Sequence, residues 1–436
     1  MGAGAFCQDV YGGERLPAMI LVGTPIVSND ARRLCLWTGG IGAVAFLYGL
    51  LCGDSIRAWQ SLLVSFLVFG GLAQAGVSIS AILQVTSSRW GRALKRTAEA
   101  TAAFFPISFL LLVMLLIGVS SWAPWVHEPV EAKAAWLNVP FFVTRQIVGF
   151  LLLTGLSLAY VYRSLRPDIG LLNQSGEHKA TGVSRLLIKG WRGNHQEQVA
   201  AQRAQSRLAP AVLIAYGWIF TLVAFDFFMS LDPHWFSTLA GGYYFIGNLF
   251  LGLAFLAVVA VWTRERLELH SYIGPHQLHD VGKLLFGFCI LWAYLFWSQY
   301  LVIWYGDLAE ETEFLHHRMH GAWAPLTWTV FALAFVIPFV VLLSRAVKTS
   351  PRGLTAIASV AFVGMWLERF VLVSPSLWHG DGVPLGVIEL LVGAGVAALF
   401  VWSYTTFLQT FPILPLADPR LEPASAHPHA HDLHAE

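Results

Sequence analysis

Long apolar runs alternate with short polar connections along the chain. A helix that crosses a bilayer needs about 20 mostly apolar residues, and ten segments have that length. The pattern therefore predicts an all-α integral membrane protein whose ten transmembrane helices occupy residues 34–408. These helices are expected to begin near Leu34, Trp59, Thr101, Phe141, Ala209, Thr238, Leu284, Trp323, Gly353 and Pro384.

Three polar stretches lie outside the expected spans: residues 1–33, a connection at about 164–208, and a tail over residues 409–436. The tail ends in ASAHPHAHDLHAE and is poor in apolar residues, so we expect it to be disordered. Neither the connection nor the tail is expected to form a separate domain. Because the first apolar run lacks a basic flank typical of a signal peptide, we expect its helix to stay in the mature protein.

The composition excludes a water-soluble protein, because 56% of the residues are hydrophobic and only 12% are charged. Most Lys and Arg residues fall in connections on one side, including RWGRALKR at 89–96 and the connection at about 164–208. The positive-inside rule then predicts that both termini are cytoplasmic. With a net charge of +1 and dispersed basic residues, no nucleic-acid partner is indicated.

Five ionisable residues fall within the expected spans, where each costs roughly 2.5–3.5 kcal/mol at a helix centre. All of them map to the outer third of the membrane, and the inner two thirds of every span are expected to carry no charge. A long side chain can reach the interface at small cost, whereas the short Asp226 side chain cannot. Asp226 is therefore expected to have a function or a buried ion partner. The five residues are Arg145, Asp226, Glu368, Arg369 and Glu389.

The outer connections add further candidates. In FDFFMSLDPHWFSTLAGGYYF, Pro233 ends one helix and leaves Asp232, His234 and Trp235 on an outer turn. We treat His234 as a possible proton acceptor. The candidates for docking a partner on this face are Asp232, Trp235, His316 and His317.

The chain shows no motif for a redox cofactor of its own. All 15 histidines lie outside the expected spans, so facing imidazoles for haem within the bundle are not expected. The four cysteines form no CxxC pattern for covalent haem or an iron–sulfur cluster. We therefore expect no metal and no cofactor bound by this chain, and no residue is assigned as certainly catalytic. The histidines of the tail, His427, His429, His431 and His434, are expected to be incidental.

Two stretches carry a resemblance to a known family: TSSRWGRALKRTAEATAAFFP from Thr86 and HDVGKLLFGFCILWAYLFWSQYLVIWYGDLAEET from His279. The shorter runs MSLDPHWFST and VIPFVVLLSR agree with it, and all four keep the same order. The chain resembles the second polysulfide-reductase-like (NrfD-like) membrane subunit of bacterial alternative complex III, a quinol:cytochrome c oxidoreductase.

The resemblance implies two adjacent four-helix bundles, spans 2–5 and 6–9, flanked by spans 1 and 10. It also implies the inner membrane of a bacterium, with iron–sulfur and multihaem cytochrome c subunits on the outer face. A second NrfD-like subunit would lie in the bilayer, and quinol or quinone would be the ligand. Asp226, Glu368 or His234 would then accept protons, while Arg145 and Arg369 hold the carboxylates ionised.

Other functions stay open at this stage. A proton path across the membrane would need uptake at the inner side, near His279, Asp280 and Lys283. An ion-coupled transporter would favour charges near the membrane midplane, and a purely structural anchor of a redox complex would leave Asp226 and Glu368 ion-paired and silent. As a subunit of an oxidoreductase, the chain is not expected to be catalytic alone.

Overall fold

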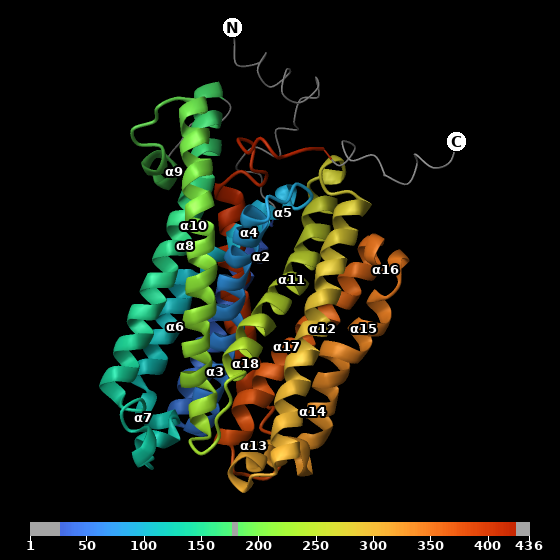
Figure 1. Ribbon diagram of the computed structural model, residues 1–436. Coiled ribbons are helices and arrows are strands. Elements are labelled where there is room, and N and C mark those ends of the chain that lie inside the picture. The colour runs from blue at the N-terminus through green and yellow to red at the C-terminus, as the bar shows by residue number, and fades with distance from the viewer. Residues whose placement is uncertain (1–26, 177–181, 424–436) are drawn as a thin grey trace.

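Helices form all the regular secondary structure in the part of the chain that the computed structural model describes, residues 27–176 and 182–423 (Figure 1). Ten helical runs are long and apolar enough to cross a membrane, which confirms the prediction of ten apolar helices in an all-α chain. They are Asn29–Leu51, Ser55–Val85, Arg92–Ile117, Val139–Ser175, Asn194–Leu231, Ala240–Arg266, Pro275–Gly306, Gly321–Leu342, Pro351–Leu377 and Val387–Thr410.

Several runs consist of more than one helical element. The first half contains α2 (Asn29–Leu51), α3 (Ser55–Ser65), η2 (Phe66–Gly70), α4 (Gly71–Val85), α5 (Arg92–Glu99), η3 (Ala100–Phe104), α6 (Phe105–Ile117), α7 (Val119–Trp122), η4 (Pro124–Val126), η5 (Glu131–Lys133), α8 (Val139–Ser175), α9 (Gly182–Leu187), α10 (Asn194–Phe227) and η6 (Met229–Leu231). The second half contains α11 (Ala240–Arg266), η7 (Leu269–Ser271), α12 (Pro275–Gly306), α13 (Ala309–Met319), η8 (Gly321–Trp323), α14 (Ala324–Phe331), η9 (Ala332–Val336), α15 (Ile337–Leu342), α16 (Arg345–Thr349), α17 (Pro351–Leu377) and α18 (Val387–Thr410).

Polar side chains define where several helices begin. The Ser28 and Asn138 side chains accept hydrogen bonds from the first turns of α2 and α8, at 3.2 and 3.0 Å. Ser350 does the same for α17, where Pro351 occupies the first helical position, which needs no amide donor. These caps satisfy backbone groups that the helix itself leaves unpaired.

Some helices extend well beyond the expected spans. The 37 residues of α8 correspond to about 55 Å at 1.5 Å per residue, longer than the roughly 30 Å hydrocarbon core. With α10 beginning at Asn194, much of the expected loop at 164–208 is helical. α5 begins at Arg92 rather than near Thr101, and this difference brings charged residues into the third helical run.

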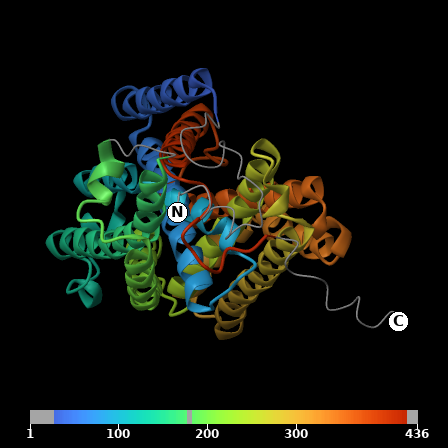
Figure 2. The ribbon, with the colours of Figure 1, turned by 90° about the horizontal axis from the view of Figure 1, so that it is seen from above.

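Close backbone contact joins the first and last spans. α2 and α18 lie side by side at one edge of the molecule (Figure 2). A Cβ atom on Gly395 would lie only 2.8 Å from the Cα atom of Gly42, so both positions need glycine. Inside the bundle, α4 packs against α10 and α11, and α11 packs against α12 and α17. Small residues allow helices in a bilayer to approach closely enough for van der Waals packing.

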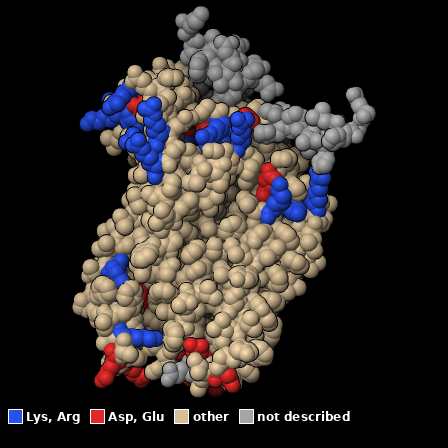
Figure 3. Space-filling view, viewed as in Figure 1, with Lys and Arg blue, Asp and Glu red and all other residues tan. Residues whose placement is uncertain are grey.

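The two ends of the bundle differ in charge. Lys and Arg residues gather at the end where α5 begins, at the top of Figure 1, which we call the basic end (Figure 3). Residues 411–423, the C-terminal segment, lie against this end. The Ala417 amide donates to Asp168 at 2.7 Å, and Asp418 lies 3.3 Å from Arg92 and 3.7 Å from Lys95. This part of the tail is therefore ordered, while the tail histidines lie outside the described residues.

Candidate functional site

An aromatic cavity of about 720 Å³ lies towards the end opposite the basic end. Residues from α11, α12, α13, α14 and α17 enclose it, together with the turn between α10 and α11. We call it the Glu368 cavity after the carboxylate in its wall. Its rings come from Phe228, Trp235, Tyr243, Trp292, Phe296, Tyr300, Phe314 and Phe331, and its polar side chains from Gln299, Arg318, Thr327 and Glu368.

Glu368 is buried, with 3% of its surface exposed. One carboxylate oxygen, Oε2, pairs with Nη1 of Arg369. The other, Oε1, meets no donor in hydrogen-bond geometry within the described chain, although the Tyr243 phenol lies close to the carboxylate. Because a buried acceptor without a donor costs free energy, this oxygen is suited to meet a donor that a ligand brings.

Arg369 also contacts residues of α11. Its Nη2 atom lies 3.1 Å from the Asn248 amide oxygen and 3.3 Å from the Tyr244 carbonyl, and its guanidinium lies over the Tyr244 ring. These contacts hold the cation next to Glu368 without occupying the cavity. The arrangement supplies positive charge beside a carboxylate that has one open acceptor.

Arg318 closes the cavity at its outer edge. It donates to the Leu372 carbonyl at 2.9 Å and to Ser376 at 2.7 Å, and Asp232 lies 3.9 Å away. Burial lowers the pKa of Arg318 to about 9, and the charge of Asp232 opposes this shift, so the guanidinium stays protonated at neutral pH. Of the residues expected to dock partners, Asp232 thus belongs to an internal pair.

Trp235 is also inside the fold. Only 1% of its surface is exposed, and its ring stacks on Phe314 with 3.7 Å between the centroids. It lies in the cavity wall rather than on a docking surface, and its indole N–H has no acceptor in the described chain. Because Trp235 and Glu368 both line the cavity, its wall holds one buried donor and one buried acceptor without partners in the described chain.

Asp226 forms a second buried cluster, on α10. Arg145 donates to both of its carboxylate oxygens at 2.7 Å. Trp136 donates at 3.1 Å, and the Gln146 side chain donates as well. The Arg145 guanidinium is also covered by the Trp136 ring at 4.2 Å. The structure therefore brings together the expected pair Arg145 and Asp226, and the carboxylate is saturated with donors.

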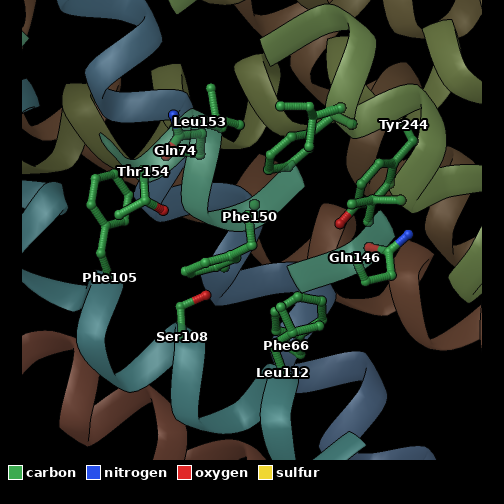
Figure 4. Close-up of a pocket in the computed structure, with 15 residues that line it drawn as sticks. Phe66, Gln74, Phe105, Ser108, Leu112, Gln146, Phe150, Leu153, Thr154 and Tyr244 are labelled. Atoms are coloured by element: carbon green, nitrogen blue, oxygen red, sulfur yellow. The ribbon is translucent and has the colours of Figure 1, made fainter. Parts of the chain in front are cut away.

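A central cavity of about 480 Å³ lies next to this pair (Figure 4). Its wall is mostly apolar, but it contains five polar side chains: Gln74, Ser108, Gln146, Thr154 and Tyr244. Gln146 connects the cavity to Asp226, and Gln74 lies 2.5 Å from Ser157 on α8. Polar groups with free space between them are where ordered water is expected within a helix bundle.

A third cluster lies at the basic end. Arg96 pairs with Glu99 at 2.6 Å and also with Asp168 on α8. Glu99 accepts from Ser80 at 2.9 Å, and Ser80 in turn lies 3.0 Å from the Tyr160 hydroxyl. All five side chains are buried. A cavity of about 390 Å³ lies beside Asp168 and is lined by this cluster and by the C-terminal segment.

This cluster shows that the third helical run begins with charged residues, earlier than the apolar pattern predicts. The apolar pattern predicts a connection at residues 89–96, whereas in the structure Arg92 begins the third helical run. The sequence held a signal for this, because Arg92, Lys95, Arg96 and Glu99 repeat at helical spacing directly before an apolar run. Arg57 is likewise helical, in α3 rather than in a loop.

The remaining candidates lie apart from these clusters. Glu389 forms a two-point pair with Arg57 at 2.8 Å and lies outside the Glu368 cavity. At the basic end Asp280 pairs with Lys283 at 2.5 Å, while His279 is half-buried on the same helix. The exposed residues at the opposite end are His234, His316 and His317. Among the described residues, no group of His, Cys, Asp and Glu could hold a metal ion.

Comparison with protein-family models finds no match, and comparison with curated proteins likewise finds none. What the fold and site define is thus a class: a multi-pass helical membrane protein with buried ionic clusters near both ends and an aromatic cavity next to one carboxylate.

Proposed function

We propose that this chain is a membrane subunit, without a cofactor of its own, of a bacterial respiratory quinol:cytochrome c oxidoreductase, and that the Glu368 cavity takes the quinol ring. The observation that carries this proposal is a buried carboxylate oxygen, Oε1 of Glu368, that has no hydrogen-bond partner in the described chain and belongs to the wall of an aromatic cavity. A hydroxylated ring that is otherwise apolar matches such a lining, because stacking contributes area and one hydrogen bond fixes orientation.

The chemistry assigned to Glu368 is proton acceptance. When a quinol is oxidised it loses electrons and protons, and its hydroxyl group needs a base within hydrogen-bond reach. The Oε1 atom would accept that proton, while Arg369 stabilises the carboxylate before transfer. The indole N–H of Trp235 could donate to a second quinol oxygen. The electrons would pass to iron–sulfur and haem c groups in partner subunits at the same end.

We also propose how the helix bundle is oriented in the membrane. Gathering of Lys and Arg at the basic end favours placing that end, with both termini, in the cytoplasm. The Glu368 cavity then opens towards the outer side of the inner membrane. Packing of α4 with α10, and of α11 with α12 and α17, supports two neighbouring bundles, spans 2–5 and 6–9. A second NrfD-like subunit would lie beside them.

The first test is isolation of the tagged chain from its native membrane in mild detergent, followed by mass spectrometry and a haem stain. We expect multihaem cytochrome c and iron–sulfur subunits to be isolated with it. A chain that is recovered alone would contradict the proposal and would favour an ion-coupled transporter.

Replacement of Glu368 tests its role within the complex. We expect Glu368→Gln to assemble normally and to slow quinol oxidation about a hundredfold or more, because an amide cannot accept the proton. The measurement is quinol:cytochrome c activity per assembled complex. The control is Glu389→Gln, which alters a buried carboxylate outside the cavity and should leave that activity unchanged. Equal activity in Glu368→Gln and the wild type would instead support the alternative in which the chain only anchors a redox complex in the membrane.

A second candidate function, proton transfer across the membrane, is favoured by a separate observation. Buried polar side chains extend from Asp168 and Glu99 through Ser80 and Tyr160 at the basic end. A separate polar pair, Gln74 with Ser157, lies at the central cavity, and Gln146 links that cavity to Asp226. For this candidate function we propose uptake within spans 2–5, near Asp168 and Glu99, as an alternative to the predicted uptake near His279, Asp280 and Lys283.

The variant Glu99→Gln tests proton transfer across the membrane independently of quinol oxidation. In vesicles that contain the whole complex, we expect this variant to keep quinol oxidation and to lose proton uptake from the basic side. The measurement is the ratio of protons moved to quinol oxidised, read with a pH-sensitive dye. An unchanged ratio would contradict proton transfer through this series.

A further inference from the structure

The short helix α9 packs against the long helix α8 at the basic end (Figure 1). Arg166 on α8 donates to the carbonyls of Leu187, Lys189 and Gly190 at 2.9–3.1 Å. The same guanidinium pairs with Glu197 on α10 at 2.7 Å. A buried arginine therefore fixes the height of residues 182–192, meaning their position along the long axis of the helix bundle.

That height corresponds to the headgroup layer of a bilayer. Arg166 lies roughly 40 Å along α8 from Val139, at about 1.5 Å per residue. The hydrocarbon core is about 30 Å thick, and with both headgroup layers the bilayer measures about 40–45 Å. If Val139 lies at the opposite interface, then Arg166 and the carbonyls it binds lie among the headgroups at the basic end.

The surface of α9 combines exposed apolar side chains with basic ones. Leu186 and Val183 have 72% and 59% of their surface exposed, on a helix that is bound to the bundle by its other side. Between residues 182 and 207 the one acidic residue is Glu197, which is buried and paired. The exposed basic residues of this stretch are Arg185, Lys189, Arg192, Arg203 and Arg207.

We propose that residues 183–192 form an interfacial anchor that docks on anionic phospholipid headgroups. Leu186 and Val183 would enter the boundary between headgroups and acyl chains, while Arg185, Lys189 and Arg192 pair with lipid phosphates. Charge complementarity selects this occupant. The anchor has three exposed basic residues, two more follow on α10, and the one acidic residue of 182–207 is buried and paired, so the stretch attracts an anionic leaflet. A protein partner is the alternative outcome of the test below.

Hydrogen exchange of the full chain in nanodiscs tests the anchor. We expect the backbone amides of residues 182–192 to exchange more slowly in discs that contain phosphatidylglycerol than in discs of phosphatidylcholine alone. Each engaged basic residue should slow exchange by up to about fivefold, and high salt should reduce the difference. The double variant R185E/K189E should lose the difference. It leaves Arg166 and its contacts in place, so the fold can be verified by protection elsewhere.

Two further variants keep the test decisive. R345E/R352E removes two exposed basic residues from α16 and α17, at the same end, and should leave the exchange of residues 182–192 as in the wild type. L186S should speed exchange in both kinds of disc, because it removes the inserted side chain. Equal exchange in the two lipids would overturn the proposal. Protection that requires other subunits of the complex would also overturn it and assign this face to a protein.

Discussion

Two of the three carboxylates predicted within the spans, Asp226 and Glu368, have different surroundings. Asp226 receives two bonds from Arg145 and others from Trp136 and Gln146, so every acceptor position is filled. Glu368 lies in a cavity wall and keeps one buried oxygen without a hydrogen-bond partner in the described chain. A saturated ion pair stabilises a buried geometry, whereas an open acceptor can exchange a proton with a ligand. This contrast favours Glu368 for chemistry and Asp226 for structure.

A double-mutant cycle on the pair tests the structural role of Asp226. We expect Asp226→Asn or Arg145→Gln alone to lower the free energy of unfolding by about 3–5 kcal/mol, since each leaves a buried partner incompletely paired. Asp226→Asn combined with Arg145→Gln should cost less than the sum of the separate changes, because no charge stays buried. Denaturation in detergent micelles measures this. Additive losses would show that the two side chains act independently.

At the scale of elements, the sequence predicted which helices exist better than where they end. Apolar length alone identified all ten spans, because the bilayer imposes that length. It placed the start of the third span near Thr101 and of the fifth near Ala209, whereas these runs begin at Arg92 and Asn194. Polar residues there are helical because tertiary partners such as Asp168 and Arg166 satisfy them, and those partners are distant in sequence.

The contact between α2 and α18 illustrates a feature that periodicity cannot predict, since a glycine in an apolar run has no visible partner. We expect Gly395→Leu to separate the two helices, because even a Cβ atom there would meet Gly42 and the Thr38 carbonyl. The expected result is a lower unfolding temperature and faster proteolysis of α2. Gly40→Leu is the control, since a Cβ atom at Gly40 meets nothing within 4 Å. If Gly395→Leu and Gly40→Leu had the same unfolding temperature and the same rate of proteolysis, the close approach of α2 and α18 would not contribute to stability.

On the scale of the whole molecule, ionic clusters near opposite ends are held by residues that are far apart in the sequence. At the basic end, the C-terminal segment contributes Asp418 to Arg92 and Lys95, and Glu422 to Arg89 at 3.2 Å. Lys95 is almost fully buried and otherwise meets Gln205. A segment that was expected to belong to a free tail therefore supplies the charge that neutralises buried cations of spans 2–5.

Truncation tests how far this end depends on the segment. A chain that ends at Thr410 loses Asp418 and the Ala417 amide that binds Asp168, so three buried charged groups lose partners. We expect its free energy of unfolding to fall by about 3–5 kcal/mol, the cost of breaking a buried pair. A chain that ends at Pro423 keeps every one of these contacts and should unfold like the full protein. If the shorter chain were equally stable, then water or rearrangement must satisfy Lys95 and Asp168, and the segment would be dispensable for the fold.

The discriminating readout is hydrogen exchange of α5, because loss of the segment should open the helix that carries Arg92, Lys95, Arg96 and Glu99 before it affects α11 or α17.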